Sequence, residues 1–123
     1  MGLDTYASRT EGDVQLTPED EEAFAKSGIE LCGGMFSGEG GASFRGKVYL
    51  DVVDRVADVW LSQDWIPPEE VRQIWIAFDR ADEDVVVEGS KDDHYPVSVE
   101  EVESLREFFR ICAERGLGLI GWY

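Results

Sequence analysis

The sequence predicts a single α+β domain over residues 1–123, in which one small sheet containing the two terminal strands packs against about four helices. Residues 2–9 and 117–123, at the two ends of the chain, have the composition of strands, whereas the residues between them repeat their apolar side chains mostly with a helical period. Strands do not alternate with helices, so a doubly wound parallel sheet is not expected. The length of 123 residues suits one domain.

Residues 17–20, Thr-Pro-Glu-Asp, contain the start signals of the first helix. A hydroxyl side chain suits the cap, proline suits the first helical position, and acids suit the positive end of the helix dipole. We expect this helix to end at Gly28 and a short strand to follow at residues 29–32. Five glycines between residues 33 and 41 then predict an exposed loop.

Two amphipathic helices are predicted in the middle of the chain, because apolar residues return every three or four positions. The inward residues of the first are Tyr49, Val52, Val53, Val56 and Trp60. Residues 64–70 form a turn that contains two prolines and leads into the second. Its inward residues are Val71, Ile74, Trp75 and Phe78.

The last helix is predicted to begin at a capping box, in which Glu101 follows Ser98 by three residues. Gly116 is the expected terminator, and Arg110 and Arg115 lie near the negative end of the helix dipole. The inward residues are Val102, Leu105, Phe109 and Cys112. The apolar residues 117–123 then form the final strand.

Charge is the strongest global property of the chain: 27 acidic residues oppose 11 basic ones, and the formal net charge is −16. A nucleic-acid partner is not expected, because such proteins neutralise phosphates with Lys and Arg. Anionic membranes would repel the chain, and no apolar run approaches the length of a membrane span. The N-terminus lacks the pattern of a secretory signal, so we expect a cytoplasmic protein. A basic protein partner would be attracted, although solubility alone would also explain the charge.

Residues 79–103 contain ten acids and only two bases, Arg80 and Lys91. Carboxylates without partners avoid burial, so we expect this segment to display them to solvent, mainly from a loop between the third and fourth helices. The acids lack the regular spacing of a calcium-binding loop. The candidate partner-binding patch is Asp82, Glu83, Asp84, Asp92 and Asp93.

Residues 41–47, Gly-Ala-Ser-Phe-Arg-Gly-Lys, match the phosphate-loop pattern G-x-x-x-x-G-K. Val48 replaces the magnesium-binding Ser or Thr of that motif, and the nearest predicted strand ends well before the first glycine. We therefore do not expect a nucleotide-hydrolysing loop. Arg45 and Lys47 instead form a candidate anion site at a helix start, unless they pair with acids of the same chain.

His94 and Tyr95 complete the candidate ligand-binding residues. The aspartates that precede His94 favour a general-acid role, but no Ser or Cys nucleophile is identifiable as its partner, and an exposed loop histidine is the alternative. The sequence leaves open whether Cys32 and Cys112 form a disulfide or stay reduced. A single histidine and two dispersed cysteines give no metal site, and no cofactor is expected.

The chain begins with MGLDTYASR, contains ELCGGMFSGEGGASFRGKVY and ends with FFRICAERGLGLIGWY. These three stretches resemble a family of small uncharacterised bacterial and phage-borne proteins that begin MGLD-x-Y. The resemblance implies a bacterial or phage origin and a cytosolic location. It carries over no catalytic residues.

Three functions follow as hypotheses. The leading one is a non-enzymatic acidic interaction module, of a regulatory, inhibitory or immunity-like kind, that binds a protein partner. The second is a small-molecule or anion-binding protein, or an enzyme, with its site near the glycine-rich segment 33–47. The third is a structural homo-oligomer whose aromatic residues cover a subunit interface. The first involves no catalysis, and we favour it.

Overall fold

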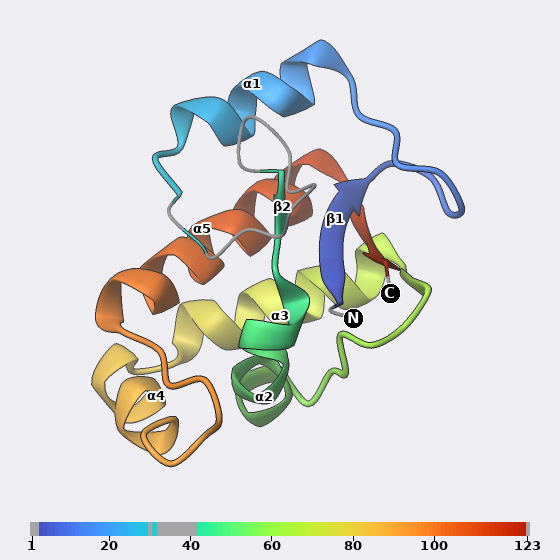
Figure 1. The fold of residues 1–123 in the computed structure, drawn as a ribbon. Coiled ribbons are helices and arrows are strands. Elements are labelled where there is room, and N and C mark those ends of the chain that lie inside the picture. Colours follow the sequence, from blue (N-terminus) through green and yellow to red (C-terminus); the bar gives the residue numbers. More distant parts are fainter. Residues whose placement is uncertain (1–2, 30, 32–41, 123) are drawn as a thin grey trace.

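The computed structural model describes residues 3–29, 31 and 42–122. Within these residues the chain forms five helices and a four-stranded antiparallel sheet, which confirms the predicted α+β class (Figure 1). The helices are α1 (Pro18–Lys26), α2 (Gly46–Ala57), α3 (Pro68–Arg80), α4 (Glu83–Gly89) and α5 (Val99–Arg115). The strands are β1 (Asp4–Ser8), β2 (Ser43–Phe44), β3 (Trp65–Ile66) and β4 (Gly118–Trp122).

The two terminal strands, β1 and β4, form the centre of the sheet, whose strand order is β2-β1-β4-β3. They pair antiparallel from Asp4 opposite Trp122 to Ser8 opposite Gly118. The two ends of the chain therefore lie side by side, as Figure 1 shows. This pairing confirms the prediction that both ends contribute strands to one sheet.

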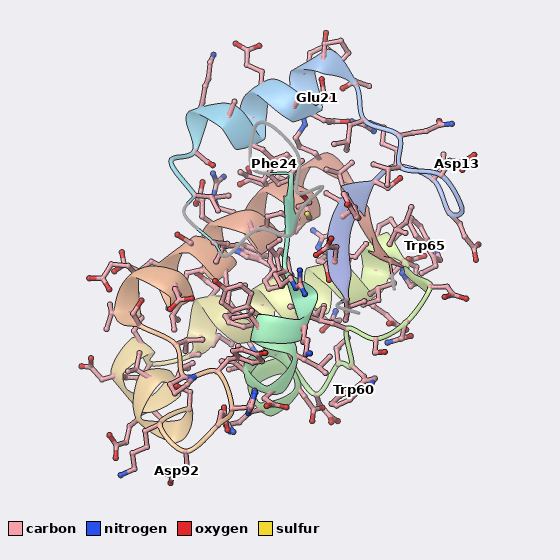
Figure 2. All side chains as sticks on the ribbon, viewed as in Figure 1. Asp13, Glu21, Phe24, Trp60, Trp65 and Asp92 are labelled. Carbon is pink, nitrogen blue, oxygen red and sulfur yellow. The ribbon has the colours of Figure 1, made fainter. Side chains whose placement is uncertain are left out.

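One face of the sheet carries the core. Side chains alternate between the two faces of a strand, so Ala7, Phe44 and Leu119 share a face, and all three are fully buried. The Phe44 ring lies 4.9 Å from the Phe108 ring of α5, measured between centroids. Phe24 points inward from α1 and lies 5.1 Å from the same ring (Figure 2). Aromatic packing thus joins β2 and α1 to α5.

The predicted inward faces of the helices are largely confirmed. In α5 the buried residues are Val102, Leu105, Phe108, Phe109, Ile111 and Cys112. In α3 they are Val71, Ile74 and Phe78, whereas Trp75 is only partly buried. Both capping predictions also hold: α1 and α5 begin with complete capping boxes at Thr17 and Ser98.

Trp60 is the exception, because it does not belong to the inward face of α2. Asp58 adopts a left-handed conformation with φ 55°, and its N–H closes onto the carbonyl of Asp54, which ends the helix. Trp60 follows this end and is 47% exposed. Periodicity extends across a helix end when no glycine or proline marks it, and the prediction for Trp60 is therefore wrong.

The sequence does not predict three of the elements. β2 and β3 contain two residues each, which is too short for a strand period to be visible. α4 lies inside the acidic segment that we expected to be mainly a loop. The predicted strand at residues 29–32 is wrong at Ile29 and Leu31, which lie in no strand, while Glu30 and Cys32 fall outside the described residues.

Candidate interaction surface

The start of α2 does not offer its backbone donors to a phosphate. The N–H of Lys47 donates to the carbonyl of Leu3 over 3.1 Å, and the N–H of Val48 donates to the carbonyl of Arg45 over 3.0 Å. A phosphate loop needs such N-terminal donors to be free. The first glycine of the motif, Gly41, lies outside the described residues. In the described part, the N–H groups of Lys47 and Val48 are therefore not available to a phosphate.

Gly46, the second glycine of the motif, has a structural role instead. It is buried and is the first residue of α2, separated from β2 only by Arg45. A Cβ atom at this position would collide with the hydroxyl of Thr5 in β1 and touch Leu3. The glycine is needed because α2 begins against the central strand of the sheet.

The candidate ligand-binding residues form two separate pairs. Arg45 and Lys47 flank the first residue of α2 and take part in no ion pair among the described residues. His94 and Tyr95 lie in the loop 90–97, where their rings meet edge to face with centroids 4.6 Å apart. The residue before His94 binds the last turn of α2, about 13 Å along the helix from its first turn. The structure therefore does not join the two pairs in one site.

Three of the five acids in the predicted patch help to hold the fold together. Asp82 caps α4 by accepting hydrogen bonds from two backbone N–H groups of its first turn. Glu83 binds the guanidinium of Arg106 from α5 at 2.5 Å. Asp93 receives two hydrogen bonds from Arg55 of α2, at 2.6 and 2.9 Å. These bonds, against a smaller effect of burial, hold the pKa of Asp93 below its usual range.

The remaining two patch acids, Asp84 and Asp92, are exposed and form no ion pair with described residues. Asp92 lies at the outer end of the loop that follows α4 (Figure 2). The prediction that this segment presents its carboxylates to solvent mainly from a loop therefore needs correction: Glu83 and Asp84 lie in α4, and Glu83 and Asp93 are only partly exposed. Capping of α4 engages Asp82, and arginines from two other helices engage Glu83 and Asp93.

Further exposed aspartates without ion pairs lie on the helices next to these two. We call the following six residues the free aspartates, because no cation of the described chain lies within ion-pair distance of them: Asp51, Asp54, Asp58, Asp79, Asp84 and Asp92. They come from α2 and its C-cap, from α3, from α4 and from the loop 90–97. The predicted patch contains only the last two, because the others are far away in the chain.

An apolar groove of about 350 Å³ lies between α2, α3 and α4. Its lining residues are Arg55, Val56, Ala77, Arg80, Ala81, Asp82, Val85 and Val86. Val85 is 69% exposed, whereas its neighbour Val86 is buried in the core. The apolar part of the lining therefore continues from the core out to the solvent.

A second hollow, of about 410 Å³, lies between the end of α1 and α5. Its described lining is polar and acidic: Ser27, Gly28, Ile29, Glu100, Glu103, Ser104 and Glu107. Arg110 hydrogen-bonds Glu107, which lowers the pKa of that carboxyl against the opposing effect of burial. Part of the negative charge of this hollow is thus neutralised within the chain.

Asp20 is a buried charge, for which the sequence predicts only a role at the helix start. Its side chain is fully buried and accepts hydrogen bonds from Arg9 (2.6 and 2.7 Å), from Arg115 (2.5 Å) and from the N–H of Thr17 (2.9 Å). Burial favours the neutral carboxyl, but these hydrogen bonds outweigh it and hold the pKa of Asp20 well below its usual range. Arg115 lies 95 residues from Asp20, and no local signal reveals such a contact.

The chemistry available elsewhere is limited. Cys112 is a free, fully buried thiol, and burial raises its pKa, so it is not a reactive thiolate; Cys32 lies outside the described residues. The described residues contain no group of three or more His, Cys, Asp or Glu side chains that could hold a metal ion. No helix in the described part of the chain is long and apolar enough to cross a membrane. No protein-family model, curated protein or solved structure matches the chain.

Proposed function

We propose that the protein is a non-enzymatic interaction module that binds a basic protein partner through the free aspartates. The observation that supports this proposal is that none of them forms an ion pair in the described chain, although they occupy neighbouring elements and only Asp51 and Asp54 interact with a nearby cation, Arg55. By contrast, most of the other acids on α3, α4 and α5 lie in first turns or ion pairs, where they stabilise the fold; among the free aspartates only Asp84 also lies in a first turn.

The free aspartates can attract a basic protein through long-range electrostatics. Unpaired carboxylates on adjacent elements add their fields, attract a basic surface over about 8 Å at physiological salt, and raise the rate of association. A regulatory, inhibitory or immunity-like role is the form of such binding that we favour. Following the resemblance of the chain to bacterial and phage-borne proteins, we place it in the cytoplasm of a bacterium, with neither nucleic acid nor membrane as its target.

Neutralising three free aspartates tests the proposal. The variant Asp54→Asn, Asp79→Asn, Asp84→Asn removes three charges, one from each of α2, α3 and α4. The control Glu11→Gln, Asp13→Asn, Glu21→Gln removes the same charge from exposed positions around the start of α1. Figure 2 places Asp13 and Glu21 well away from Asp92.

Wild type, variant and control are immobilised, and the proteins that each captures from a bacterial extract at low salt are identified. We expect a basic protein that is retained by wild type and control and is lost with the first variant. Its association rate with purified wild type should fall as salt rises. Equal retention of every captured protein by all three would contradict the proposal and leave the charge as an aid to solubility.

Anion binding at Arg45 and Lys47 is the second candidate function. It is favoured by the absence of ion pairs from these two residues to other described residues, in a chain with 27 acids. If they bind an anion, phosphate should raise the melting temperature of wild type but not of Arg45→Gln, Lys47→Gln. An equal shift in both proteins would assign the effect to general salt screening.

A further inference from the structure

We infer that Trp60, at the acidic end of α2, stacks on an arginine side chain of the basic partner. This inference rests on the proposed function and specifies which cation the partner presents. Three observations carry it: an exposed indole, a loop that holds the indole in place, and carboxylates directly beside it in the chain. Figure 2 shows Trp60 at the margin of the molecule, where the chain has just left α2.

The indole of Trp60 is open to solvent and does not belong to the hydrophobic core. Its side chain is 47% exposed, whereas that of Leu61, the next residue, is fully buried. Tryptophan is enriched among the residues that carry most of the binding energy at protein interfaces. Its ring face also attracts cations more strongly than the rings of phenylalanine and tyrosine do. Trp60 is therefore suited to contact a cation of a partner.

The loop 58–64 is ordered before any partner binds. Leu61 anchors it in the core. The side-chain amide of Gln63 donates to the carbonyl of Trp60 over 2.6 Å, and the N–H of Gln63 donates to the carbonyl of Leu61 over 2.8 Å. The carbonyl of Gln63 lies so close to β4 that a Cβ atom at Gly121 would collide with it. A loop held in this way loses little conformational entropy on binding, which favours affinity.

The carboxylates nearest to Trp60 come from the end of α2 and from the same loop. Asp54 and Asp58 are exposed and lie one turn apart, since the N–H of Asp58 donates to the carbonyl of Asp54 over 2.8 Å. Asp58 precedes Trp60 by two residues, so their Cα atoms are at most about 7.6 Å apart. Asp64 is also exposed and directly follows Gln63, whose side chain contacts Trp60. All three carboxylates lack ion pairs with described residues.

The cations of α2 do not neutralise this end of the helix. Arg55 attracts Asp54, but both of its hydrogen bonds go to Asp93, which balances its charge. Lys47 belongs to the first turn of α2 and lies about 16 Å from Asp58 along the helix axis. That distance exceeds the screening length of about 8 Å at physiological salt. The end of α2 therefore keeps a negative charge that α2 itself does not compensate.

The carboxylate of Asp58 is not explained by the stability of α2. It lies at the negative end of the helix dipole, where cations stabilise a helix and acids do not. Asp58 is also the only described residue other than glycine with a positive φ, 55°, a conformation that glycine adopts at most helix ends. Glycine would therefore end the helix at a lower cost. A role in binding accounts for the acid at this position.

Arginine suits this arrangement better than lysine. Its planar guanidinium can stack on the face of an indole while its N–H groups donate to a carboxylate at the side. The ammonium group of lysine is a compact, strongly hydrated charge and gains less from the ring. Asp58 and Asp64 are the expected acceptors for an arginine that stacks on Trp60.

Hexa-arginine and hexa-lysine peptides, which carry equal charge, test the inference. Their dissociation constants are measured at low salt, and the indole N–H signals of the protein are followed by NMR. We expect hexa-arginine to bind wild type about threefold more tightly and to shift the indole signal that is absent from Trp60→Leu. Trp60→Leu should bind the two peptides equally. Trp60→Phe should keep part of the preference, because a phenyl ring also attracts cations.

Val14→Ala is the matched control, because Val14 is another exposed apolar residue (41%) but lies in the loop before α1. It should leave the preference for hexa-arginine unchanged. The pair Asp58→Asn, Asp64→Asn should weaken the binding of hexa-arginine about fivefold. The pair Glu11→Gln, Asp13→Asn removes the same charge elsewhere and should weaken it less.

No preference for hexa-arginine in wild type, or a preference that persists in Trp60→Leu, overturns the inference. If the aspartate-to-asparagine triple variant (Asp54→Asn, Asp79→Asn, Asp84→Asn) still weakens the binding of both peptides, the proposed function survives that result. No binding of either peptide to wild type overturns both proposals.

Two other occupants are tested without peptide. Tryptophan also suits membrane surfaces, so binding to phosphatidylcholine vesicles is measured by flotation, and self-association is measured by sedimentation. We expect no vesicle binding, because one indole buries little apolar area. We expect no dimer, because two copies that each carry a net charge of −16 repel one another. Vesicle binding or a dimer that is lost in Trp60→Leu would overturn the arginine of a partner as the occupant.

Discussion

Asp20 places a full negative charge in the interior, at the point where the loop after β1, the start of α1 and the end of α5 meet. The charge is tolerated because four hydrogen bonds replace its water shell: two come from Arg9, one from Arg115 and one from a backbone N–H. The two arginines remain partly exposed, so only the carboxylate carries the full cost of burial.

Replacing Asp20 with Asn should destabilise the protein strongly. The amide cannot balance two guanidinium groups, and we expect the free energy of unfolding to fall by about 3 kcal/mol, at the lower end for a broken buried pair because both arginines can rehydrate. Urea unfolding measures this change. Glu22→Gln is the control, because its pair with Lys26 is exposed and screened by solvent and should contribute far less to stability. Equal effects of the two substitutions would contradict the structural role of Asp20.

Asp20 should also make the free energy of unfolding depend on pH in the acidic range. Its pKa is depressed in the folded state, so the unfolded chain takes up a proton first as the pH falls. The contribution of Asp20 is therefore complete above about pH 5, begins to be lost as the pH drops through the unfolded pKa near 3.9, and goes on falling until the pH is below the depressed folded pKa. We expect the unfolding free energy of wild type to fall more steeply between about pH 5 and 3 than that of Asp20→Asn. Parallel curves from urea titrations would exclude this contribution.

The residue scale also shows where prediction from the sequence ends. The sequence identifies Asp20 as a favourable acid in a first helical turn, because that signal lies within four residues. It does not reveal the contact with Arg115, because that contact depends on how α1 and α5 pack. The same applies to the predicted acidic patch: nothing near Asp93 in the chain reveals that Arg55 binds it. Tertiary ion pairs decide which acids are free, and these are invisible to local patterns.

At the scale of single elements, the ends of α1 and α5 follow local rules, whereas the end of α2 at Asp58 and the short strands do not. The boxes at Thr17 and Ser98 begin α1 and α5, and Gly116 ends α5 with φ 71°, as predicted. α4 also has a start signal, an aspartate cap followed by two acids, but three consecutive valines favour another interpretation. β2 and β3 exist only because longer strands lie beside them.

Gly116, the C-cap of α5, and Gly118, the first residue of β4, should differ in the stability that they lose on substitution by alanine. A Cβ at Gly116 meets no atom within 4 Å, so Gly116→Ala should cost only the strain of a left-handed alanine, about 1 kcal/mol. A Cβ at Gly118 would lie 2.6 Å from the carbonyl oxygen of Ile66 and against the ring of Trp65. Gly118→Ala must therefore move β3 and should lower the free energy of unfolding by more than Gly116→Ala does. The melting temperatures of the two variants test this expectation. A larger decrease in Gly116→Ala than in Gly118→Ala would contradict the close contact of β3 with β4.

The start of α2 leads to a prediction about nucleotides. Because the N–H of Lys47 is bonded to Leu3, ATP with magnesium should leave the melting temperature unchanged. Binding at tenfold above its dissociation constant would add about 1.4 kcal/mol and would be visible in a thermal scan. A clear rise in wild type that disappears in Lys47→Ala would show that the phosphate-loop match is functional after all.

At the scale of the whole molecule, the net charge of −16 acts on stability as well as on binding. Ion pairs engage seven acids of the described chain, namely Asp20, Glu22, Glu83, Glu88, Asp93, Glu107 and Glu114. Most of the remaining carboxylates repel one another across the surface. The folded state concentrates this repulsion more than the unfolded state does.

Added salt should therefore stabilise the protein. Raising sodium chloride from about 0.01 M to 0.15 M shortens the screening length from about 30 Å to 8 Å, which removes most long-range repulsion. We expect the melting temperature to rise over this interval and then to level off. The aspartate-to-asparagine triple variant should show a smaller rise, because it begins with less charge. A fall in melting temperature would mean that the ion pairs outweigh the repulsion.

The central position of β1 and β4 also affects how the protein is made. In a nascent chain β1 is synthesised long before its longest partner strand, residues 118–122. The helices can form while synthesis proceeds, because their hydrogen bonds are local, but the sheet that they cover has no centre until those residues leave the exit tunnel. Cotranslational intermediates therefore lack the β1–β4 pairing, and the apolar residues that the completed sheet covers stay open to chaperones until β4 has left the exit tunnel.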